Sequence, residues 1–374
     1  MFSEIKIKNF KSLKELDINF KNLTLFTGIN SSGKSSTIQV LLLLKQNFQI
    51  YGSMMKTLKL PMETFKNIFQ KLSINGEYLD LGLGKNILYN KADDDILELQ
   101  LILEEGQVNF KSDIRESKEE ESINCEMNYS NNIDELFLQN NFTYLSADRI
   151  VPQSSYKYSK ENVLRGNLGK SGEYTIHYLA ENKNTPITLK ELQYPDANSN
   201  QLLENVEYWL SKISKGIKVI PEVNINFQHS TLQYSYGGSE ILPQNIGFGV
   251  TYVLPIIVAI LKAKKGDVVI IENPESHLHP SGQVEIARLC AKASEAGVQI
   301  VVETHSDHFL NGVRVAIKEK ILNSNNALVY YFLRNEEEEK TEVQKIEIDE
   351  NGKIDEWPKG FFDEWDIQLE KLLW

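Results

Sequence analysis

The sequence has little cysteine, no long apolar run and no excess of basic charge. Its two cysteines, Cys125 and Cys290, are far apart in the chain, which excludes a disulfide framework and a cysteine-based zinc site. No segment reaches the roughly 18 apolar residues that a membrane-spanning helix needs, and the best candidate, residues 253–261, contains Pro255. Charged residues stand where a signal peptide is apolar, so we expect a cytoplasmic protein with no membrane partner.

The 374 residues carry a net charge of −12, unlike the basic surface of proteins that coat nucleic acid non-specifically. Two local basic groups remain, within residues 157–170 and residues 262–265. A solvated surface is the simpler interpretation of both groups, and nucleic acid stays open as a partner. Because 41% of the residues are hydrophobic, the chain can bury one large core or two modest ones.

The residue pattern predicts an α/β protein. Residues 4–8, 16–20 and 23–27 alternate apolar and polar side chains as strands do, and a helix is expected over residues 34–48. The short alternating segments within residues 71–146 predict an antiparallel β lobe.

Residues 151–216 are rich in polar residues and glycine, and we expect them to form a helical insertion. Strands are expected again at residues 217–236. Beyond them the pattern alternates, with helices beginning near positions 248, 281 and 307 and apolar strands between them. This order is typical of a parallel α/β layer.

A phosphate-binding loop is predicted at residues 28–35, which read Gly-Ile-Asn-Ser-Ser-Gly-Lys-Ser and fit G-x-x-x-x-G-K-[ST]. The glycines let successive backbone N–H groups turn toward a phosphate, and the following helix directs its N-terminal dipole there. Lys34 would place its charge between the β and γ phosphates, and the Ser35 hydroxyl would bind Mg²⁺. ATP is therefore the expected ligand.

Two later strands end in polar residues. Residues 268–275 read VVIIENPE, and residues 301–306 read VVETHS. Parallel strands present their carboxyl ends at one edge of a sheet, where ligands bind. We therefore expect Glu272, Glu275 and His305 to lie near the bound phosphates.

Together, GINSSGKSS, NIGFGVTYVLP, IIENPESHLHP and VVETHSD resemble the ABC-type ATPases of the SMC, RecF and OLD group. The likeness is greatest with small prokaryotic AAA-labelled ATPases, which include phage-defence ATPases, and NFKS (residues 9–12) and YLSADR (residues 144–149) share it. The resemblance covers essentially the whole chain. It implies an ABC-type ATPase head with a mixed or parallel P-loop sheet, an antiparallel β lobe and a helical insertion.

The resemblance also assigns roles to residues. The nucleotide contacts would be Gly28, Asn30, Ser31, Ser32, Gly33, Lys34, Ser35 and Ser36, with Asn245, Gly247 and Gly249 in place of the signature motif that touches the partner subunit's γ-phosphate. Glu272 would be the Walker B acid near Mg²⁺, with Ser35 as the other metal ligand. His305 would be the switch histidine, and residues 276–280 the loop that contacts the other copy of a dimer.

Two departures from the group bear on the chemistry. The signature reads NIGFG instead of the serine-containing LSGG, although Asn245 and the glycines can still present donors at a helix N-terminus. The position after the Walker B acid, usually a glutamate, is Asn273, whose amide cannot accept a proton from the attacking water. We therefore expect slow ATP hydrolysis in which Glu275 supplies part of the base function. Alternatively, Glu275 is a helix N-terminal residue favoured by the dipole.

Four histidines imitate a transition-metal cluster: His277, His279, His305 and His308. Two of them directly follow the Walker B strand, where loop packing and dimer contacts are the commoner role. We therefore expect His277 and His279 to pack in a loop or to contact the other copy of a dimer, and we do not expect a transition-metal site.

The resemblance implies an ATP-driven switch that forms a homodimer, or a higher homo-oligomer, around ATP and controls a separate effector or a nucleic-acid transaction in anti-phage defence. The effector would be a nuclease or a toxin. The alternative is an OLD-like nuclease-associated or DNA-repair ATPase acting directly on DNA, although the residues after His305 are too few for the nuclease domain of OLD proteins. We expect one ABC-type ATPase domain over residues 1–374, divided into residues 1–150, 151–216 and 217–374.

Overall fold

The structure is a computed structural model that describes residues 1–60, 64–130, 142–195, 197–354 and 356–373. The chain forms two compact units: unit 1 contains residues 1–21, 26–139 and 330–345, and unit 2 contains residues 22–25, 140–329 and 346–374. It passes from one unit to the other within strands β3 (Leu23–Gly28) and β16 (Ala327–Asn335). Among the described residues, no helix is long and apolar enough to span a membrane.

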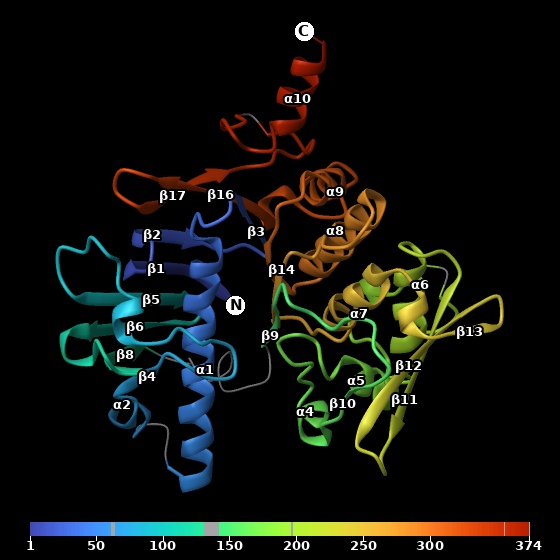
Figure 1. Cartoon of the computed structure of the whole chain (residues 1–374), viewed down its shortest axis with the longest axis horizontal. Helices are drawn as coiled ribbons and strands as arrows, with labels where there is room; N and C mark the ends of the chain where they lie inside the picture. The colour runs from blue at the N-terminus through green and yellow to red at the C-terminus, as the bar shows by residue number, and fades with distance from the viewer. Residues whose placement is uncertain (61–63, 131–141, 196, 355, 374) are drawn as a thin grey trace. The chain divides into compact units, whose positions relative to one another are not determined.

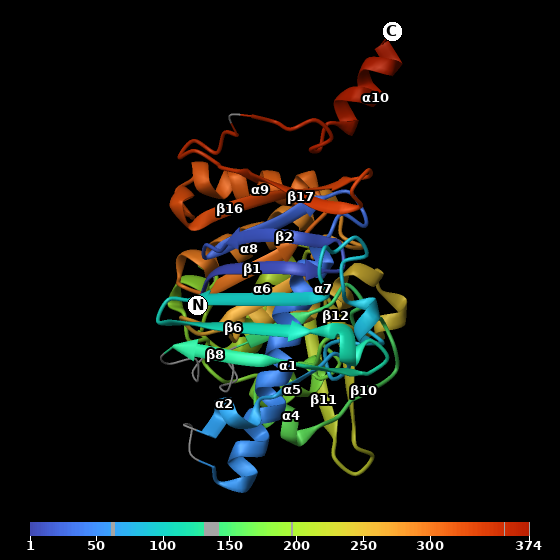
Figure 2. The ribbon, with the colours of Figure 1, turned by 90° about the vertical axis from the view of Figure 1, so that its left-hand side faces the viewer.

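Unit 1 is built on an antiparallel sheet with the strand order β2-β1-β5-β6-β8, whose strands lie side by side in Figure 2. The strands are β1 (Phe2–Phe10), β2 (Leu13–Asn19), β5 (Ile96–Leu103), β6 (Gly106–Asp113) and β8 (Glu126–Ser130). Side chains along β5 alternate between buried and half-buried, as expected where one face of a sheet covers a core. The antiparallel lobe predicted from the sequence is confirmed.

Helix α1 (Lys34–Leu58) lies beside this sheet (Figure 1) and continues beyond its predicted end at Phe48. The Phe48 ring is buried, 5.6 Å from the ring of Phe65 and 6.1 Å from that of Phe110 on β6. These contacts hold the middle of α1 against the lobe. Unit 1 also contains α2 (Phe65–Ile68), β4 (Lys71–Ser73) and β7 (Ser122–Asn124), together with β17 (Lys340–Ile346) in the order β17-β16-β3.

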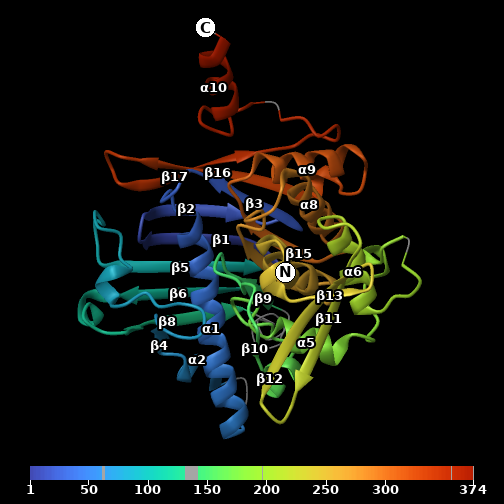
Figure 3. The same cartoon turned by 45° about the vertical axis from the view of Figure 1, so that its right-hand side comes forward.

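Unit 2 contains the predicted parallel layer. Strand β14 (Val268–Glu272) pairs in parallel with β15 (Gln299–Glu303) on one side and with β9 (Phe142–Leu145) on the other. The register places Glu272 opposite Glu303, so both polar strand ends lie at one edge, as predicted. The helices of this layer are α7 (Phe248–Leu261), α8 (Pro280–Glu295) and α9 (Asp307–Lys318), of which α8 and α9 lie side by side in Figure 3.

Strand β9 corrects one prediction. Its residues belong to the span that we assigned to the antiparallel lobe, but β9 runs parallel to β14 in unit 2. Phe142, Tyr144 and Leu145 are all buried. Burial of neighbouring residues on both faces is typical of a parallel strand and outweighs the short alternating pattern.

The insertion is helical in part. Helices α5 (Thr175–Asn182) and α6 (Leu202–Ser211) agree with the expected helical insertion, and α4 (Lys160–Leu164) is a further short helix. The short strand β10 (Tyr156–Lys157) instead joins β12 (His229–Tyr236), which also pairs with β11 (Ile217–Asn224) and β13 (Ser239–Ile241). The last helix is α10 (Glu364–Leu373).

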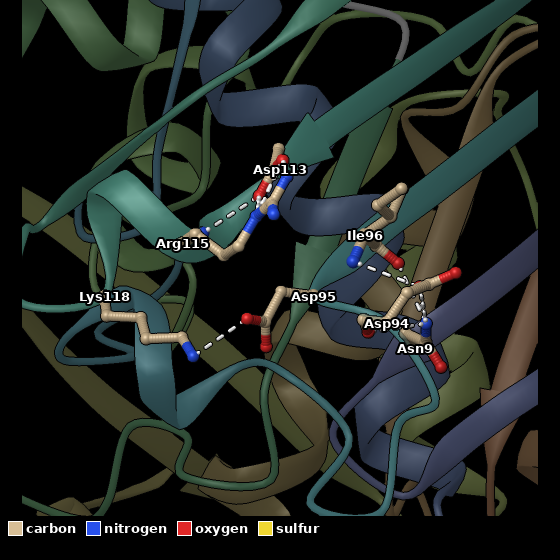
Figure 4. Close-up of polar contacts among 7 residues, drawn as sticks. All are labelled: Asn9, Asp94, Asp95, Ile96, Asp113, Arg115 and Lys118. Carbon is tan, nitrogen blue, oxygen red and sulfur yellow. Dashed lines mark hydrogen bonds and ion pairs between the residues drawn. The ribbon is translucent and has the colours of Figure 1, made fainter.

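A buried asparagine shapes the end of β1 in unit 1 (Figure 4). Asn9 has a left-handed backbone, with φ 63°, and its Nδ2 donates to Asp94 Oδ1 (3.0 Å) and to Ile96 O (2.9 Å). Asparagine tolerates this conformation better than most residues. The same turn leads to Ser12, which matters for the phosphate-binding loop described below.

We predict that Asn9→Ala lowers the free energy of unfolding by about 2–4 kcal/mol, because it removes two part-buried hydrogen bonds and leaves a strained backbone. Asn9→Gly relieves the strain but not the loss of hydrogen bonds, so it should cost about 1 kcal/mol less. Urea denaturation of both variants measures this difference. Equal losses would show that backbone strain plays no part.

Candidate functional site

The predicted phosphate-binding loop of unit 1 joins β3 to α1, and its backbone requires both motif glycines. Gly28 has φ 135° and Gly33 has φ 105°. A Cβ atom would lie 2.2 Å from Phe332 O at Gly28, and 2.2 Å from Thr341 Oγ1 at Gly33. No other residue type fits either position without moving its neighbours.

Lys34 is buried at the start of α1, where its ammonium is held by the loop itself. Its Nζ donates to Gly28 O (3.0 Å) and Ile29 O (2.7 Å). No side chain caps the N-terminus of α1, so the helix dipole and the Lys34 charge act on the same loop. The other predicted contacts differ in burial: Ser32 and Gly33 are buried, Gly28 and Ser36 are half-buried, and Asn30, Ser31 and Ser35 are exposed.

Strand β17 braces this loop through a contact that the sequence analysis missed. Thr341 Oγ1 donates to Ser32 O (2.8 Å) and shares a second hydrogen bond with Ser12 Oγ (2.8 Å). Thr341 N also donates to Ser12 O (2.7 Å). Ser12 is the last residue of NFKS, so this segment contacts the loop through Thr341.

In unit 2, Glu272 lies at the end of β14 and is held by two donors. The Tyr144 hydroxyl donates to its Oε1 (3.1 Å), and Ala147 N donates to its Oε2 (3.1 Å). Burial raises the pKa of Glu272, although these hydrogen bonds oppose the shift. Both donors come from the YLSADR segment.

Arg149, in the same segment, is a structural residue to which the sequence analysis gave no role. It is buried, and its Nη1 donates to Ser146 O (2.8 Å) and Glu272 O (2.5 Å), while Nη2 donates to Asn273 O (2.7 Å). Its guanidinium carbon lies 4.3 Å from the centre of the Tyr252 ring on α7. One side chain therefore holds the turn after β14.

Asn273 takes a left-handed backbone in this turn, with φ 45°, and its N–H donates to Glu303 O (2.8 Å). Its side-chain Oδ1 is buried and has no hydrogen-bond partner among the described residues. The turn thus presents a buried amide oxygen at the position where the resembling ATPases carry a glutamate.

The structure brings Glu275 and His305 together. Glu275 Oε2 accepts a hydrogen bond from the Thr304 hydroxyl (2.8 Å), and Oε1 accepts one from His305 N (2.8 Å). Burial raises the pKa of Glu275, against the effect of these donors. Glu275 is not a helix N-terminal residue, because α8 begins at Pro280 behind the cap residue His279.

The residues at the signature position form the start of α7. Asn245 and Gly247 are exposed, and Gly249 is buried, with no room for a Cβ because His277 O would lie 2.2 Å away. The His277 ring packs against Phe248 (4.5 Å) and Tyr252 (4.9 Å). In the part of the chain that the structure describes, no three His, Cys, Asp or Glu residues gather as metal ligands would.

Three family models match the chain. "AAA ATPase domain" matches residues 1–218; "AAA domain, putative AbiEii toxin, Type IV TA system" matches residues 167–311; and "Protein of unknown function (DUF3696)" matches residues 322–372. A search of curated proteins found no match.

Solved structures share the fold. The SMC head domain from Thermotoga maritima is 11% identical, with a TM-score of 0.50 over 93% of this chain and 99% of that one. A Smc head bound to the C-winged helix domain of ScpA is also 11% identical, with a TM-score of 0.50 over 93% and 98%. These likenesses confirm the predicted fold class. Since the first family model covers more than half of the residues, this chain belongs to the AAA ATPase domain family and is a P-loop ATPase with the fold of SMC heads.

Proposed function

We propose that this ATPase is a switch in which two copies close on two ATP molecules and thereby control a separate effector in anti-phage defence. The observation that carries the proposal is the start of α7. Asn245 and Gly247 are exposed there, and no side chain caps the helix. An uncapped helix N-terminus offers backbone N–H groups to a phosphate. In the resembling group, this segment contacts the nucleotide of the partner subunit.

The packing around α7 supports closure between copies. His277, in the loop that we expect to contact the other copy, packs on Phe248 and Tyr252 of α7, and its backbone carbonyl fits against Gly249. The signature segment and the loop of residues 276–280 thus form one continuous surface of unit 2. A second copy could engage both segments at once.

The chemistry of the predicted metal ligands fits Mg²⁺. The Ser35 hydroxyl and the Glu272 carboxylate are oxygen ligands of the kind that Mg²⁺ prefers, and Mg²⁺ usually keeps phosphate and water ligands as well. Glu272 is buried enough for its pKa to be raised, so a nearby cation would stabilise its ionised form. Bound Mg²⁺ would neutralise charge on the phosphates, while Lys34 would position them.

We further propose slow hydrolysis with Glu275 as the base. Asn273 cannot take a proton from water, whereas Glu275 is a neighbouring carboxylate with a raised pKa, which brings it closer to the range where a base works well at neutral pH. Its hydrogen bonds to Thr304 and His305 N fix its position. A slow rate suits a switch, because the closed state then persists.

Two comparisons bear on the proposed effector. The family description that matches residues 167–311 names a toxin of a type IV toxin–antitoxin system. One SMC head of the same fold is bound to a domain of another protein, ScpA. The bound head supports transmission of closure to a protein partner, and the family description supports a link to toxin systems; we propose that the partner is a nuclease or a toxin.

Lys34→Met should abolish the thermal stabilisation by Mg-ATP, because it removes the charge held in the phosphate-binding loop. For the unchanged protein, ligand at 100 times its Kd should add about 2.7 kcal/mol of stability. Melting curves with and without Mg-ATP measure both effects. Lys56→Met changes an exposed lysine of the same helix and should leave the shift intact. A normal shift in Lys34→Met would contradict the assignment.

Gly247→Glu should prevent association driven by a non-hydrolysable ATP analogue, because a carboxylate at the start of α7 would repel the partner's γ-phosphate. A side chain fits there, since an added Cβ at Gly247 meets nothing within 4 Å. Light scattering measures the association. The matched variant Gly247→Gln adds the same bulk without charge and should associate more readily. Both variants should still show the Mg-ATP melting shift, and normal association of Gly247→Glu would rule out this contact.

Glu275→Gln should lower the single-turnover hydrolysis rate by roughly 10²- to 10⁴-fold. The unchanged enzyme should lose activity as the pH falls through the raised pKa of Glu275, because the base acts only when deprotonated. Glu275→Gln should flatten that part of the profile.

Two further variants separate catalysis from positioning. Thr304→Val removes one donor to Glu275 and should reduce the rate without removing the pH dependence. Asn273→Asp tolerates the left-handed backbone and restores a carboxylate at the usual position. If Asn273→Asp raises the rate at least tenfold while Glu275→Gln changes nothing, no base acts in the unchanged enzyme and the proposed role of Glu275 is wrong.

A further inference from the structure

The tip of the β11–β12 hairpin exposes a large aromatic side chain in unit 2. Phe227 is 75% exposed, and its ring centre lies 6.2 Å from that of His229. The tip has a fixed shape: Phe227 N donates to Asn224 Oδ1 (3.3 Å), and Gln228 takes a left-handed φ of 50°. A bulky ring is therefore presented to solvent on a structured turn.

The fold brings the basic segment of the insertion to this tip. Strand β10 pairs with β12, so that Lys157 lies directly opposite His229. Their neighbours Tyr156 and Ser230 are buried, which turns Lys157 and His229 to the outer face. Phe227 contacts His229 as well, so a cation and two aromatic rings follow one another along one side of the hairpin.

Further cations follow Lys157 in the chain. Lys160 begins helix α4, and Arg165 is its C-cap residue; both are exposed. Helix α4 and the hairpin tip lie at the same end of unit 2 in Figures 1 and 2. The pairs Lys157–Glu173 (3.9 Å) and Arg165–Glu161 (2.7 Å) involve exposed cations. Surface ion pairs of this kind contribute little free energy, so a phosphate can compete for these cations.

We propose that this surface, made by Lys157, Lys160, Arg165, Phe227 and His229, binds single-stranded nucleic acid. An exposed ring beside a group of cations suits a strand whose unpaired bases can stack and whose phosphates are charged. An unpaired base can stack on Phe227, whereas the bases of a duplex are already stacked on each other. The proposal does not depend on ATP binding or on closure between copies.

Fluorescence anisotropy of the full chain with labelled dT20 and U20, compared with a 20-base-pair duplex, tests the proposal. We expect the single strands to bind more tightly than the duplex. If three phosphates are engaged, the logarithm of the association constant should fall against the logarithm of salt concentration with a slope of roughly −2. Both strands carry unpaired bases joined by phosphates. Comparison of dT20 with U20 therefore shows whether the surface distinguishes DNA from RNA.

Phe227→Ala should weaken binding roughly 5- to 100-fold, as loss of one stacked base predicts. Ile225→Ala, which removes an exposed apolar side chain from the same tip, should change it less than twofold. The double change Lys157→Gln and Lys160→Gln should bring the salt slope to about −0.7. As a control, Lys318→Gln with Lys320→Gln alters two exposed lysines at the end of α9 and should leave the salt slope unchanged.

Failure of this proposal is distinguishable from failure of the proposed switch, because all these variants should keep the melting shift with Mg-ATP. Two results would overturn it. One is single-strand binding no tighter than that of an acidic control protein such as serum albumin. The other is unchanged binding by Phe227→Ala, which would place the nucleic acid on another surface.

Discussion

The carboxyl edge of the parallel layer in unit 2 depends on one buried guanidinium. A chain that turns directly after a buried parallel strand leaves carbonyl groups that need donors. Arg149 satisfies those of Glu272 and Asn273 together with that of Ser146, and it lies over the Tyr252 ring. The Tyr252 hydroxyl in turn donates to Ala147 O. The ends of β9 and β14 and the start of α7 are therefore fixed to one another. In the proposed switch, the turn after β14 and helix α7 would therefore move as one body.

The sequence predicted those parts of the site that have a local signal. The phosphate-binding loop needs glycine at two positions with positive φ, and both glycines belong to the eight-residue motif that is recognised in the sequence. Strands β14 and β15 are short apolar runs that end in an acid, which was enough to predict their parallel pairing and the common edge at Glu272 and Glu303. Local patterns of this kind are predictive because the backbone conformation itself restricts which residue type can occupy each position.

The contacts that hold the site in place have no such signal. Thr341 supports the phosphate-binding loop from a position 309 residues away from Ser32, and nothing in the residues around it marks that role. The sequence does not distinguish Arg149 from the other charged residues, because its role depends on three carbonyl partners that only the fold brings to it. Helix α1 was predicted too short because its continuation past Phe48 packs on another element: the Tyr51 ring lies 4.3 Å from the ring of Phe69. Tertiary packing decides such boundaries more than helix propensity does.

The backbone at Asn273 offers a physical reason for its residue type. At φ 45°, asparagine is among the few non-glycine residues tolerated, and a long carboxylate side chain would add strain of about 1–2 kcal/mol. The turn is fixed from both sides, by Arg149 on its carbonyls and by Glu303 O on its N–H, so it cannot relax to suit a glutamate. The Arg149 contacts that order the turn after β14 therefore also disfavour a glutamate at this position. In the proposed switch, Glu275, which accepts hydrogen bonds from Thr304 and His305 N, is the nearby carboxylate that would take the place of that glutamate as the base.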